Sequence, residues 1–247
     1  MKERKASINA YDSQQRVDIY EKNMKVMHPN RRKMIQSALE FLSFNLQATL
    51  KAIDIGIGTG FFSLEFLKKF NNSIVIGIDG ANKMIELAKV RLKDFSDNVK
   101  FRIGDFRDLP KLLNNISNVD AVFSSFALHH LNMKEKEILL RYLYKIIKKD
   151  CWFINADVII AESKKIEERF QEIRINGILQ RAKQAKDPRF LEYQTTRKFL
   201  DDLELNENDQ PLSLSEDLII LKKVGFQNID ILWKEYREVV LCAQKKD

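Results

Sequence analysis

The chain is poor in cysteine and has no long apolar run. Among its 247 residues only two are cysteines, Cys151 and Cys242, so a disulfide-rich secreted scaffold is excluded. Both lie in apolar, strand-like segments, and we expect buried free thiols in a reducing cytosol. No stretch approaches the ~18 apolar residues of a membrane-spanning helix, and the polar start MKERKASINAYDSQQR lacks the core of a signal peptide. We therefore expect a cytoplasmic protein without a membrane partner.

Histidine is also scarce, which bears on metal binding. The chain has three histidines, His28 and the adjacent pair His129 and His130. Transition-metal sites usually draw on several histidine, cysteine or carboxylate ligands at recognisable spacings. Because no such set is spaced along this sequence, we expect no metal ion.

Neither sign of charge is missing, and the excess of positive charge is modest. The chain has 42 Lys and Arg against 35 Asp and Glu, a net charge of +7. The lysines are scattered and often flanked by acids, as in ESKKIEER at residues 162–169, which is typical of solvated helix faces. A nucleic-acid partner is therefore not favoured, although the charge leaves it open. The length fits a single, well-buried α/β domain.

What the chain does have is a glycine-rich turn between an apolar run and a helix-like segment. Residues 51–60 read KAIDIGIGTG, so the apolar run stops at Gly56, Gly58 and Gly60. Residues 61–70 then carry apolar side chains at helical spacing. This pattern predicts a strand, a turn where the backbone can approach a ligand closely, and a helix whose first N–H groups are unpaired.

The spacing of these glycines discriminates between ligands. A dinucleotide fingerprint needs G-x-G-x-x-G, and here the third glycine comes one residue early. A phosphate-binding P-loop needs a Lys-Ser or Lys-Thr pair after the last glycine, and none follows. The remaining pattern, D-x-G-x-G-x-G from Asp54, favours a ligand that carries a cation near this carboxylate. A purely structural turn is the alternative.

Three later strand-like runs also end in side chains suited to a ligand. Asp79 follows the continuously apolar run SIVIGI, Asp105 and Phe106 follow an alternating run, and Ser125 follows VDAVFS. Asp79 lies near the offset of about 20 residues from the glycine turn at which an acid meets ribose hydroxyls. Strands that alternate with helices predict a doubly wound sheet, whose ligands bind at the carboxyl ends of the strands. We therefore expect these strand ends to face one crevice.

The remaining segments complete a single domain, residues 1–247. We expect a helical leader at 1–50, a cofactor-binding core at 51–160, a charged helical insertion at 161–210, and a closing helix and strand pair at 211–247. A long insertion is typical of a lid, a substrate wall or a subunit contact. A homodimer formed through the insertion is compatible with this layout.

On these residues, the sequence resembles the class I S-adenosylmethionine-dependent methyltransferases over nearly its whole length. The matching segments are DIGIGTG (54–60), IGIDGANKMIELAK (76–89), FRIGDF (101–106), VDAVFSSFALHHL (119–131) and the ending LKKVGFQNIDILWKEYREVVLCAQK. The chain looks most like small methyltransferases related to the carboxy-S-adenosylmethionine synthases of tRNA wobble-uridine modification. The resemblance implies an α/β, Rossmann-like, doubly wound seven-stranded sheet with its last strand antiparallel, and S-adenosylmethionine as the cofactor.

The resemblance also implies roles for individual residues. Asp54 would lie near the ammonium group of the cofactor, Asp79 would hold the ribose hydroxyls, and Asp105 would accept from the adenine amine. The full set of implied cofactor-binding residues is Arg31, Asp54, Gly56, Ile57, Gly58, Gly60, Asp79, Gly80, Met84, Asp105, Phe106 and Ser125. No metal ligand is among them.

The chain departs from the synthases at points that bear on the reaction. Its glycine turn is more regular, and Ser125 stands where the synthases have Asn. The synthases need a cationic residue in the insertion for the extra carboxylate, and Arg197 is the counterpart that the alignment offers. We therefore favour methyl transfer to an O or N atom of a small-molecule acceptor. The alternatives are an RNA-modification enzyme, including a carboxy-S-adenosylmethionine synthase-like activity, and a non-catalytic cofactor-binding protein.

Methyl transfer from a sulfonium needs alignment and exclusion of water more than acid catalysis. An acceptor hydroxyl or amine still has to lose its proton, and His129 or His130 is the candidate base near neutral pH. The alternative for this His-His-Leu sequence is a structural role at a helix entry. The sequence lacks the Asn-Pro-Pro-aromatic run of amino-methylating enzymes at 124–127, and no cysteine follows a proline as in cytosine-C5 enzymes.

Overall fold

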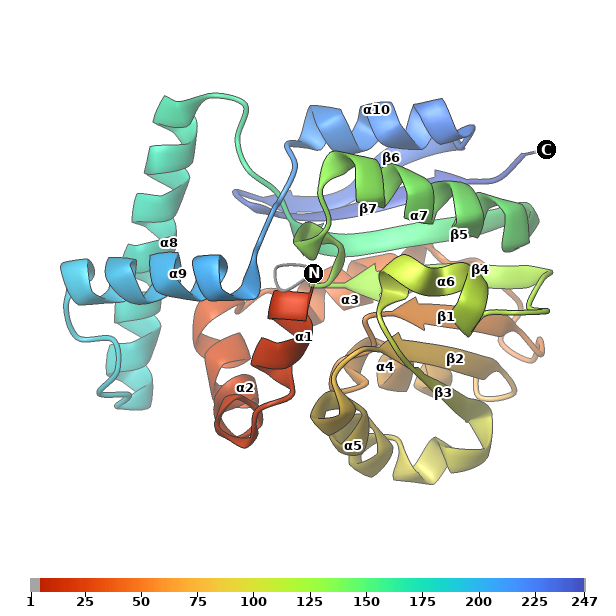
Figure 1. The fold of residues 1–247 in the computed structure, drawn as a ribbon, viewed down its shortest axis with the longest axis horizontal. Helices are drawn as coiled ribbons and strands as arrows, with labels where there is room; N and C mark the ends of the chain where they lie inside the picture. The colour runs from red at the N-terminus through yellow and green to blue at the C-terminus, as the bar shows by residue number, and fades with distance from the viewer. Residues whose placement is uncertain (1–4, 247) are drawn as a thin grey trace.

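The computed structural model describes residues 5–246, which fold around one seven-stranded sheet (Figure 1). The strands are β1 (Lys51–Ile55), β2 (Ile74–Asp79), β3 (Val99–Ile103), β4 (Val119–Ser125), β5 (Ile147–Val158), β6 (Gln227–Glu235) and β7 (Glu238–Gln244). Their order is β3-β2-β1-β4-β5-β7-β6. The first five strands are parallel, and β7 pairs antiparallel with both β5 and β6. The expected doubly wound sheet with an antiparallel last strand is confirmed.

Helices cover both faces of the sheet. They are α1 (Ala6–Tyr11), α2 (Gln14–Met27), α3 (Arg31–Phe41), α4 (Phe61–Lys69), α5 (Asn82–Arg91), α6 (Leu109–Leu112), α7 (Met133–Ile146), α8 (Lys164–Ala185), α9 (Tyr193–Glu207) and α10 (Leu214–Val224). Side chains of α6, α7 and α10 share one buried apolar cluster with the sheet. Side chains of α3, α4 and α5 form the cluster on the opposite face. This two-sided burial explains why the parallel strands read as continuous apolar runs.

The chain order places a switch point beside β1. After β1 the chain builds β2 and β3 on one side, and it then crosses to β4 and β5 on the other. Ala52 of β1 pairs with Val75 of β2 and with Ala121 of β4. In such sheets a crevice opens between the two strands whose connections leave in opposite directions. Here that crevice lies at the carboxyl ends of β1 and β4, where the glycine turn and Ser125 stand.

The helix boundaries follow from local side-chain chemistry. Both α7 and α10 begin with a capping box, formed by Asn132 with Glu135 and by Ser213 with Glu216. Helix α10 ends at Gly225, whose φ of 112° is a left-handed conformation that favours glycine.

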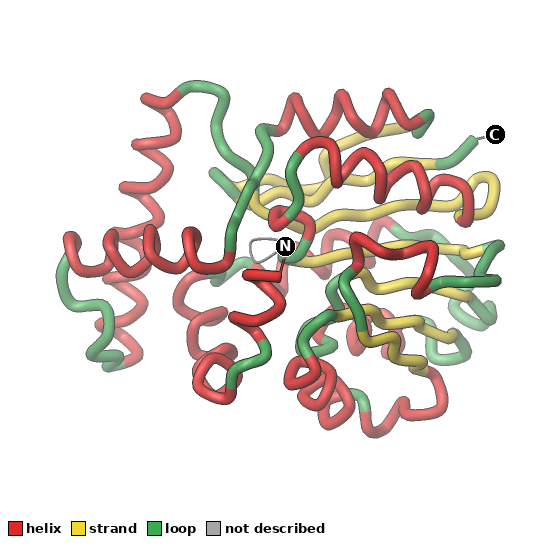
Figure 2. The backbone as a smooth tube through the Cα atoms, in the orientation of Figure 1, coloured by secondary structure: helices red, strands yellow, loops and turns green. Residues whose placement is uncertain are grey.

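The leader and the insertion form a helical layer beyond the carboxyl ends of the strands. Figure 2 shows this part of the molecule without strands, to one side of the sheet. Its own apolar cluster joins Val26 and Met27 of α2 to Ile175 and Ile178 of α8. The crevice is therefore covered by segments that are far apart in the sequence. Within residues 5–246, no helix is both long enough and apolar enough to span a membrane.

Candidate active site

The glycine turn after β1 adopts the conformation that its sequence predicts. Gly56, Gly58 and Gly60 all have positive φ, at 68°, 53° and 76°. A Cβ on Gly56 would overlap the Cβ of Ala127, so the turn passes directly against the segment after β4. A Cβ on Gly58 would meet no atom closer than 3.9 Å. The two glycines therefore have different roles. Gly56 allows the turn to pack against Ala127, whereas Gly58 leaves space for a ligand to approach the backbone.

A cavity, the first cavity, opens between this turn and α1, α2 and the ends of β2 and β4. Ten of the twelve residues that the resemblance assigns to the cofactor line it: Arg31, Asp54, Gly56, Ile57, Gly58, Asp79, Gly80, Met84, Phe106 and Ser125. Gly60 and Asp105 do not line it. Residues from four separate strand ends thus meet in one place, as the strand-end argument requires.

The two remaining residues have structural partners instead. Gly60 is the N-cap of α4, and a Cβ there would come within 2.8 Å of the Leu92 side chain. Asp105 caps the short 3₁₀ helix that follows it by accepting from the Arg107 backbone N–H at 2.9 Å, and its carboxylate pairs with the Arg107 guanidinium at 3.2 Å. In this structure the Asp105 carboxylate is therefore held by Arg107 rather than turned into the first cavity.

Asp79 ties the glycine turn to the end of β2. One carboxylate oxygen accepts from the Gly58 N–H and the other from the Ala81 N–H, both at 2.9 Å. Burial raises the pKa of this carboxyl, while these backbone N–H groups oppose the shift. The side chain thus shapes the wall of the first cavity and also presents oxygen atoms to it.

Asp54 is a buried acid under the glycine turn, only 1% exposed. The Ser63 hydroxyl donates to it at 2.6 Å. Burial raises the pKa of Asp54 to about 7, and the neighbouring Asp79 adds to the shift. Such a carboxyl stabilises a cation that binds beside it, because the cation offsets the desolvation of the charged form.

Arg31, at the start of α3, also reaches this cavity. Its guanidinium lies over the Phe61 ring, 4.6 Å from the centroid, and 3.7 Å from a carboxylate oxygen of Glu21. Its Nε is buried without a hydrogen-bond partner. A buried N–H without a partner is rare in folded proteins, so Arg31 has a donor available to a ligand.

A second cavity adjoins the first. Both are lined by the aromatic side chains of Tyr11, Tyr20 and Phe126. Its other walls come from α2, the end of β5, and the insertion helices α8 and α9. Phe126 has a φ of 51°, which is unusual for a bulky residue and is often found at functional sites.

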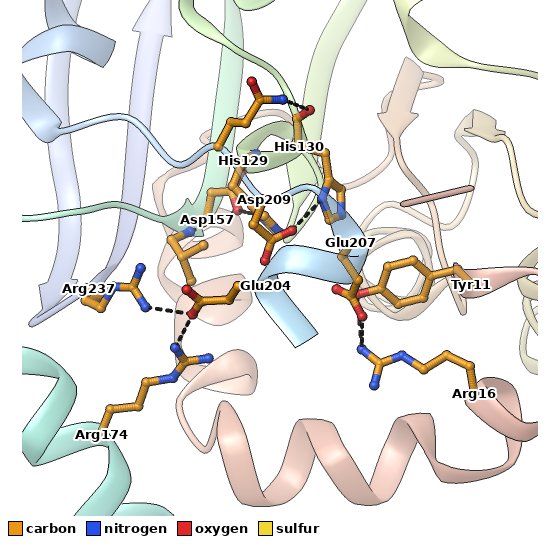
Figure 3. A network of polar contacts seen from close by, with 12 residues as sticks. Tyr11, Arg16, His129, His130, Asp157, Arg174, Glu204, Glu207, Asp209 and Arg237 are labelled. Atoms are coloured by element: carbon orange, nitrogen blue, oxygen red, sulfur yellow. Dashed lines mark hydrogen bonds and ion pairs between the residues drawn. The ribbon is translucent and has the colours of Figure 1, made fainter. Parts of the chain in front are cut away.

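The histidine pair lies where the two cavities meet (Figure 3). His130 lines the first cavity, and His129 lines the second. Asp157, at the end of β5, accepts from the His129 backbone N–H at 3.0 Å and lies 2.6 Å from its Nδ1. Asp209, in the loop after α9, lies 2.8 Å from His130 Nδ1 and 3.6 Å from His129 Nε2.

The two imidazoles differ in their electrostatic surroundings. Burial alone would lower the pKa of His129, but the carboxylates of Asp157 and Asp209 raise it to about 9. Burial and the neighbouring His129 lower the pKa of His130. The negative potential of the two carboxylates therefore favours positive charge at this junction.

The second cavity also contains a network of partly buried ion pairs, drawn in Figure 3. Glu204 accepts from Arg174 at 2.5 Å and from Arg237 at 3.1 Å. Glu207 accepts from the Tyr11 hydroxyl at 2.7 Å and from Arg16 at 2.5 Å, which joins α9 to the leader. Polar groups that converge in a largely buried cavity can fix the orientation of a small ligand.

Arg197, the cation expected to face the site from the insertion, does not do so. Its side chain is 41% exposed and pairs with Asp201 one turn along α9, at 2.9 Å. Arg174 of α8 is the cation from the insertion that lines the second cavity. The expectation for Arg197 was wrong because the packing of α9 against α1 and α8, not the apolar pattern of the insertion, decides which face of α9 turns inward.

Sequence reasoning missed several residues of the two cavities. Asp157 could have been found, because it ends the strand β5 just as Asp79 ends β2. Tyr11, Glu207 and Asp209 carry no such signal, since the first two end helices and Asp209 lies in a loop.

The comparisons with known proteins agree with this geometry. The family described as "Methyltransferase domain" matches residues 52–150, which contain the glycine turn, Asp79, Asp105 and the histidine pair. A carboxy-S-adenosyl-L-methionine synthase from Nautilia profundicola is 28% identical over 184 residues, covering 74% of this chain and 72% of that protein.

Two solved structures show the same fold. Magnesium protoporphyrin IX methyltransferase from Synechocystis, with S-adenosylmethionine bound, has a TM-score of 0.66 and 14% identity, and the match covers 100% of this chain and 98% of that one. An O-methyltransferase family protein from Burkholderia thailandensis has a TM-score of 0.67 and 11% identity, covering 96% of this chain but only 62% of that longer one. Sheet topology, glycine turn and sequence matches together support a class I S-adenosylmethionine-dependent methyltransferase with S-adenosylmethionine as its cofactor.

Proposed function

We propose that this protein transfers a methyl group from S-adenosylmethionine to an oxygen or nitrogen atom of a small molecule bound in the second cavity. The observation that carries this proposal is the adjacency of the two cavities, which share Tyr11, Tyr20 and Phe126 as walls. A donor in one cavity and an acceptor in the other would be aligned for in-line displacement. Alignment and exclusion of water are what this reaction chiefly requires of a protein.

In this proposal the cofactor occupies the first cavity. Asp54 lies under the methionine end and stabilises its ammonium group, while Gly58 leaves room for close backbone approach. Asp79 binds the ribose hydroxyls, and Met84 and Phe106 flank the adenine. The sulfonium then points toward Ser125 and the histidine pair. His129 and His130 are proposed to assist removal of the acceptor's proton.

Two features of the second cavity favour a small-molecule acceptor. The leader and the insertion enclose it, and the three arginines that line it, Arg16, Arg174 and Arg237, are already paired with Glu207 or Glu204. An enzyme that acts on RNA would be expected to surround its site with cations that contact phosphates. A nucleic-acid partner is therefore not proposed, and a homodimer through the insertion stays a prediction.

Two observations favour carboxy-S-adenosylmethionine synthase-like activity as a second candidate. Proteins with that name are among the curated relatives. In addition, Arg174 and Arg237 both face the second cavity, where a carboxylate could replace or share Glu204 as their partner. The two candidates differ in the product formed from the cofactor.

Mass spectrometry of the cofactor products tests both candidates. The protein is incubated with S-adenosylmethionine alone. In parallel samples it is incubated with S-adenosylmethionine together with a panel of phenols, carboxylic acids or amines. Acceptor-dependent release of S-adenosylhomocysteine, with a gain of one methyl group on the acceptor, is the expected result. A cofactor that gains a carboxyl group would favour the second candidate. Tight cofactor binding without any turnover across the panels would contradict both.

Alanine substitutions at the two glycines should separate fold from cofactor binding. Gly58→Ala adds a Cβ in open space on the cavity wall, so we expect a small loss of stability, about 1 kcal/mol from the left-handed conformation. Its methyl group would obstruct the cofactor and weaken binding at least about tenfold, or about 1.4 kcal/mol. Gly56→Ala overlaps Ala127 and should instead cost about 2–4 kcal/mol in unfolding free energy.

Thermal unfolding and isothermal titration calorimetry with S-adenosylmethionine check this contrast. Equal losses of stability in the two variants would show that the Ala127 contact is unimportant. Unchanged cofactor affinity in Gly58→Ala would argue against the proposed cofactor position.

A further inference from the structure

We propose that His129, His130 and Asp209 bind a divalent transition-metal ion at the junction of the two cavities. The two histidines are 6% and 4% exposed, and the Asp209 side chain is 13% exposed. This inference goes beyond the proposed methyl transfer and replaces the expectation of no metal. That expectation required ligands spaced along the sequence, whereas the fold brings Asp209 to the histidine pair from 79 residues beyond His130.

The distances between the potential ligand atoms suit one ion. Asp209 Oδ1 lies 2.8 Å from His130 Nδ1 and 3.6 Å from His129 Nε2. All three groups offer ligand atoms within 4.8 Å of one another. Ligands about 2.0–2.1 Å from a tetrahedral ion are separated by roughly 3.3 Å. Side-chain adjustments that bring these separations toward roughly 3.3 Å would place the three atoms around a common centre.

The contact between the side chains of His130 and Asp209 is consistent with a cation bound between them. His130 Nδ1 and Asp209 Oδ1 are both buried, and beyond their 2.8 Å contact with each other neither atom has a hydrogen-bond partner. Buried polar atoms normally have a partner, and the exceptions call for an explanation such as an ion. Two buried ligand atoms that face each other without a further partner are in a position to share a metal ion.

The surroundings hold both rings in the orientation that a metal would need. Asp157 lies 2.6 Å from His129 Nδ1, which leaves Nε2 to face Asp209. A carboxylate on the distal nitrogen of a ligating histidine is the usual outer partner in metal sites. The backbone is fixed as well, since the Gln210 N–H donates to the His129 carbonyl at 2.7 Å and Arg107 donates to the His130 carbonyl at 2.8 Å.

The donor set indicates the class of ion. Two imidazoles and one carboxylate suit Zn²⁺, Co²⁺, Ni²⁺ or Fe²⁺, whereas Mg²⁺ and Ca²⁺ prefer oxygen ligands alone. Three protein ligands leave at least one coordination position open, as in catalytic rather than structural sites. Because His130 lines the first cavity and His129 and Asp209 line the second, an open position would face the acceptor. A bound ion would there lower the pKa of an acceptor hydroxyl.

Titration of the metal-free protein with Co²⁺ and Zn²⁺ tests this inference without any acceptor or cofactor. The expected result is one ion per chain by calorimetry, a visible absorption spectrum typical of Co²⁺ with nitrogen and oxygen ligands, and a higher Tm with Zn²⁺. Asp209→Asn and His130→Gln should remove each of these three signals. Asp157→Asn should weaken Co²⁺ binding by about 10–100-fold, because the outer partner of His129 is lost.

His28→Gln is the matched control, since His28 is the remaining histidine and pairs with Glu238 outside the cluster. It should bind Co²⁺ like the wild type. Absence of binding to the folded wild type would show that the cluster holds only a proton and would overturn the inference. Binding that persists unchanged in folded Asp209→Asn would place the ion elsewhere and would overturn it equally. Neither outcome depends on methyl transfer, so failure here is distinct from failure of the proposed function.

Discussion

Asp79→Ala is expected to weaken S-adenosylmethionine binding by at least about 100-fold, the larger of the two effects on affinity expected here. In the proposed cofactor position the carboxylate accepts from the ribose hydroxyls, and hydrogen bonds to a charged group contribute about 1.5–3 kcal/mol each. Two such bonds correspond to about 100-fold or more in Kd. The substitution also removes the acceptors for the Gly58 and Ala81 N–H groups, so the glycine turn loses its link to β2.

Calorimetric titration with S-adenosylmethionine and with S-adenosylhomocysteine measures this effect. Asp97→Ala is a matched control, because Asp97 is an exposed acid in the segment before β3 and lines neither cavity. Asp79→Asn separates charge from shape, since the amide retains one acceptor oxygen and should give an intermediate loss. If folded Asp79→Ala binds the cofactor as tightly as the wild type, the first cavity does not hold the ribose as proposed.

Asp54→Asn is expected to stabilise the free protein above neutral pH and yet to weaken cofactor binding. Burial is the main cause that raises the folded-state pKa of Asp54 from its ordinary value of 3.8 to about 7. The folded state therefore binds the proton more tightly than the unfolded state. Stability from this group is fully present below the unfolded pKa and is lost as pH rises toward 7. Asparagine carries no charge, so the variant avoids this loss, which reaches up to about 4 kcal/mol at pH 8.

The effect of the same substitution on the cofactor has the opposite sign. With S-adenosylmethionine bound, the Asp54 carboxylate would be ionised and would stabilise the ammonium group. Wild-type affinity should therefore increase as pH rises through about 7, with release of a proton, whereas the affinity of Asp54→Asn should vary little over this range. At pH 8 we expect the variant to bind about 30–100-fold more weakly, as befits the loss of a charge-assisted hydrogen bond.

Denaturant unfolding measures the effect on stability, and calorimetric titration measures the effect on cofactor affinity. Both are carried out between about pH 5 and pH 8.5, a range that includes the pKa of Asp54 of about 7. Asp217→Asn provides a contrast, because Asp217 is also buried with a raised pKa but pairs with Lys136 at 2.8 Å. Its substitution leaves a buried ammonium without a partner and should destabilise the protein. A loss of stability in Asp54→Asn at pH 8 would contradict the expectation that the buried Asp54 carboxylate destabilises the free protein at this pH.

The effects of Asp79→Ala and Asp54→Asn on affinity would together show how the cofactor is oriented in the first cavity. Asp79 reports on the ribose, and Asp54 reports on the methionine end, so a ligand that senses both must extend along the glycine turn. This is the orientation that directs the sulfonium toward Phe126 and the second cavity. The Co²⁺ titration is independent of both variants, because the metal ligands lie beyond the sulfonium end.

The sequence by itself determined the sheet and the location of the first cavity. The glycines need positive φ, the parallel strands need continuous apolar runs, and Asp79 ends a strand at the offset expected from the turn. Each of these features is local, and the rule that ligands bind at the carboxyl ends of parallel strands joins them. Ten of the twelve residues assigned to the cofactor consequently line one cavity. What each of them contacts in the complex stays a prediction.

Tertiary packing decided the rest, because it depends on groups that are distant in the sequence. Tyr11 meets Glu207 across 196 positions, and Asp209 meets a histidine pair on another element. A charged helix can bury any of several faces, so only the contacts of α8 show that Arg174 lines the second cavity while Arg197 stays exposed. Likewise, the sequence alone does not show that the Asp105 carboxylate pairs with the nearby Arg107. The acceptor cavity and the candidate metal cluster therefore exist only once the leader and the insertion have packed together.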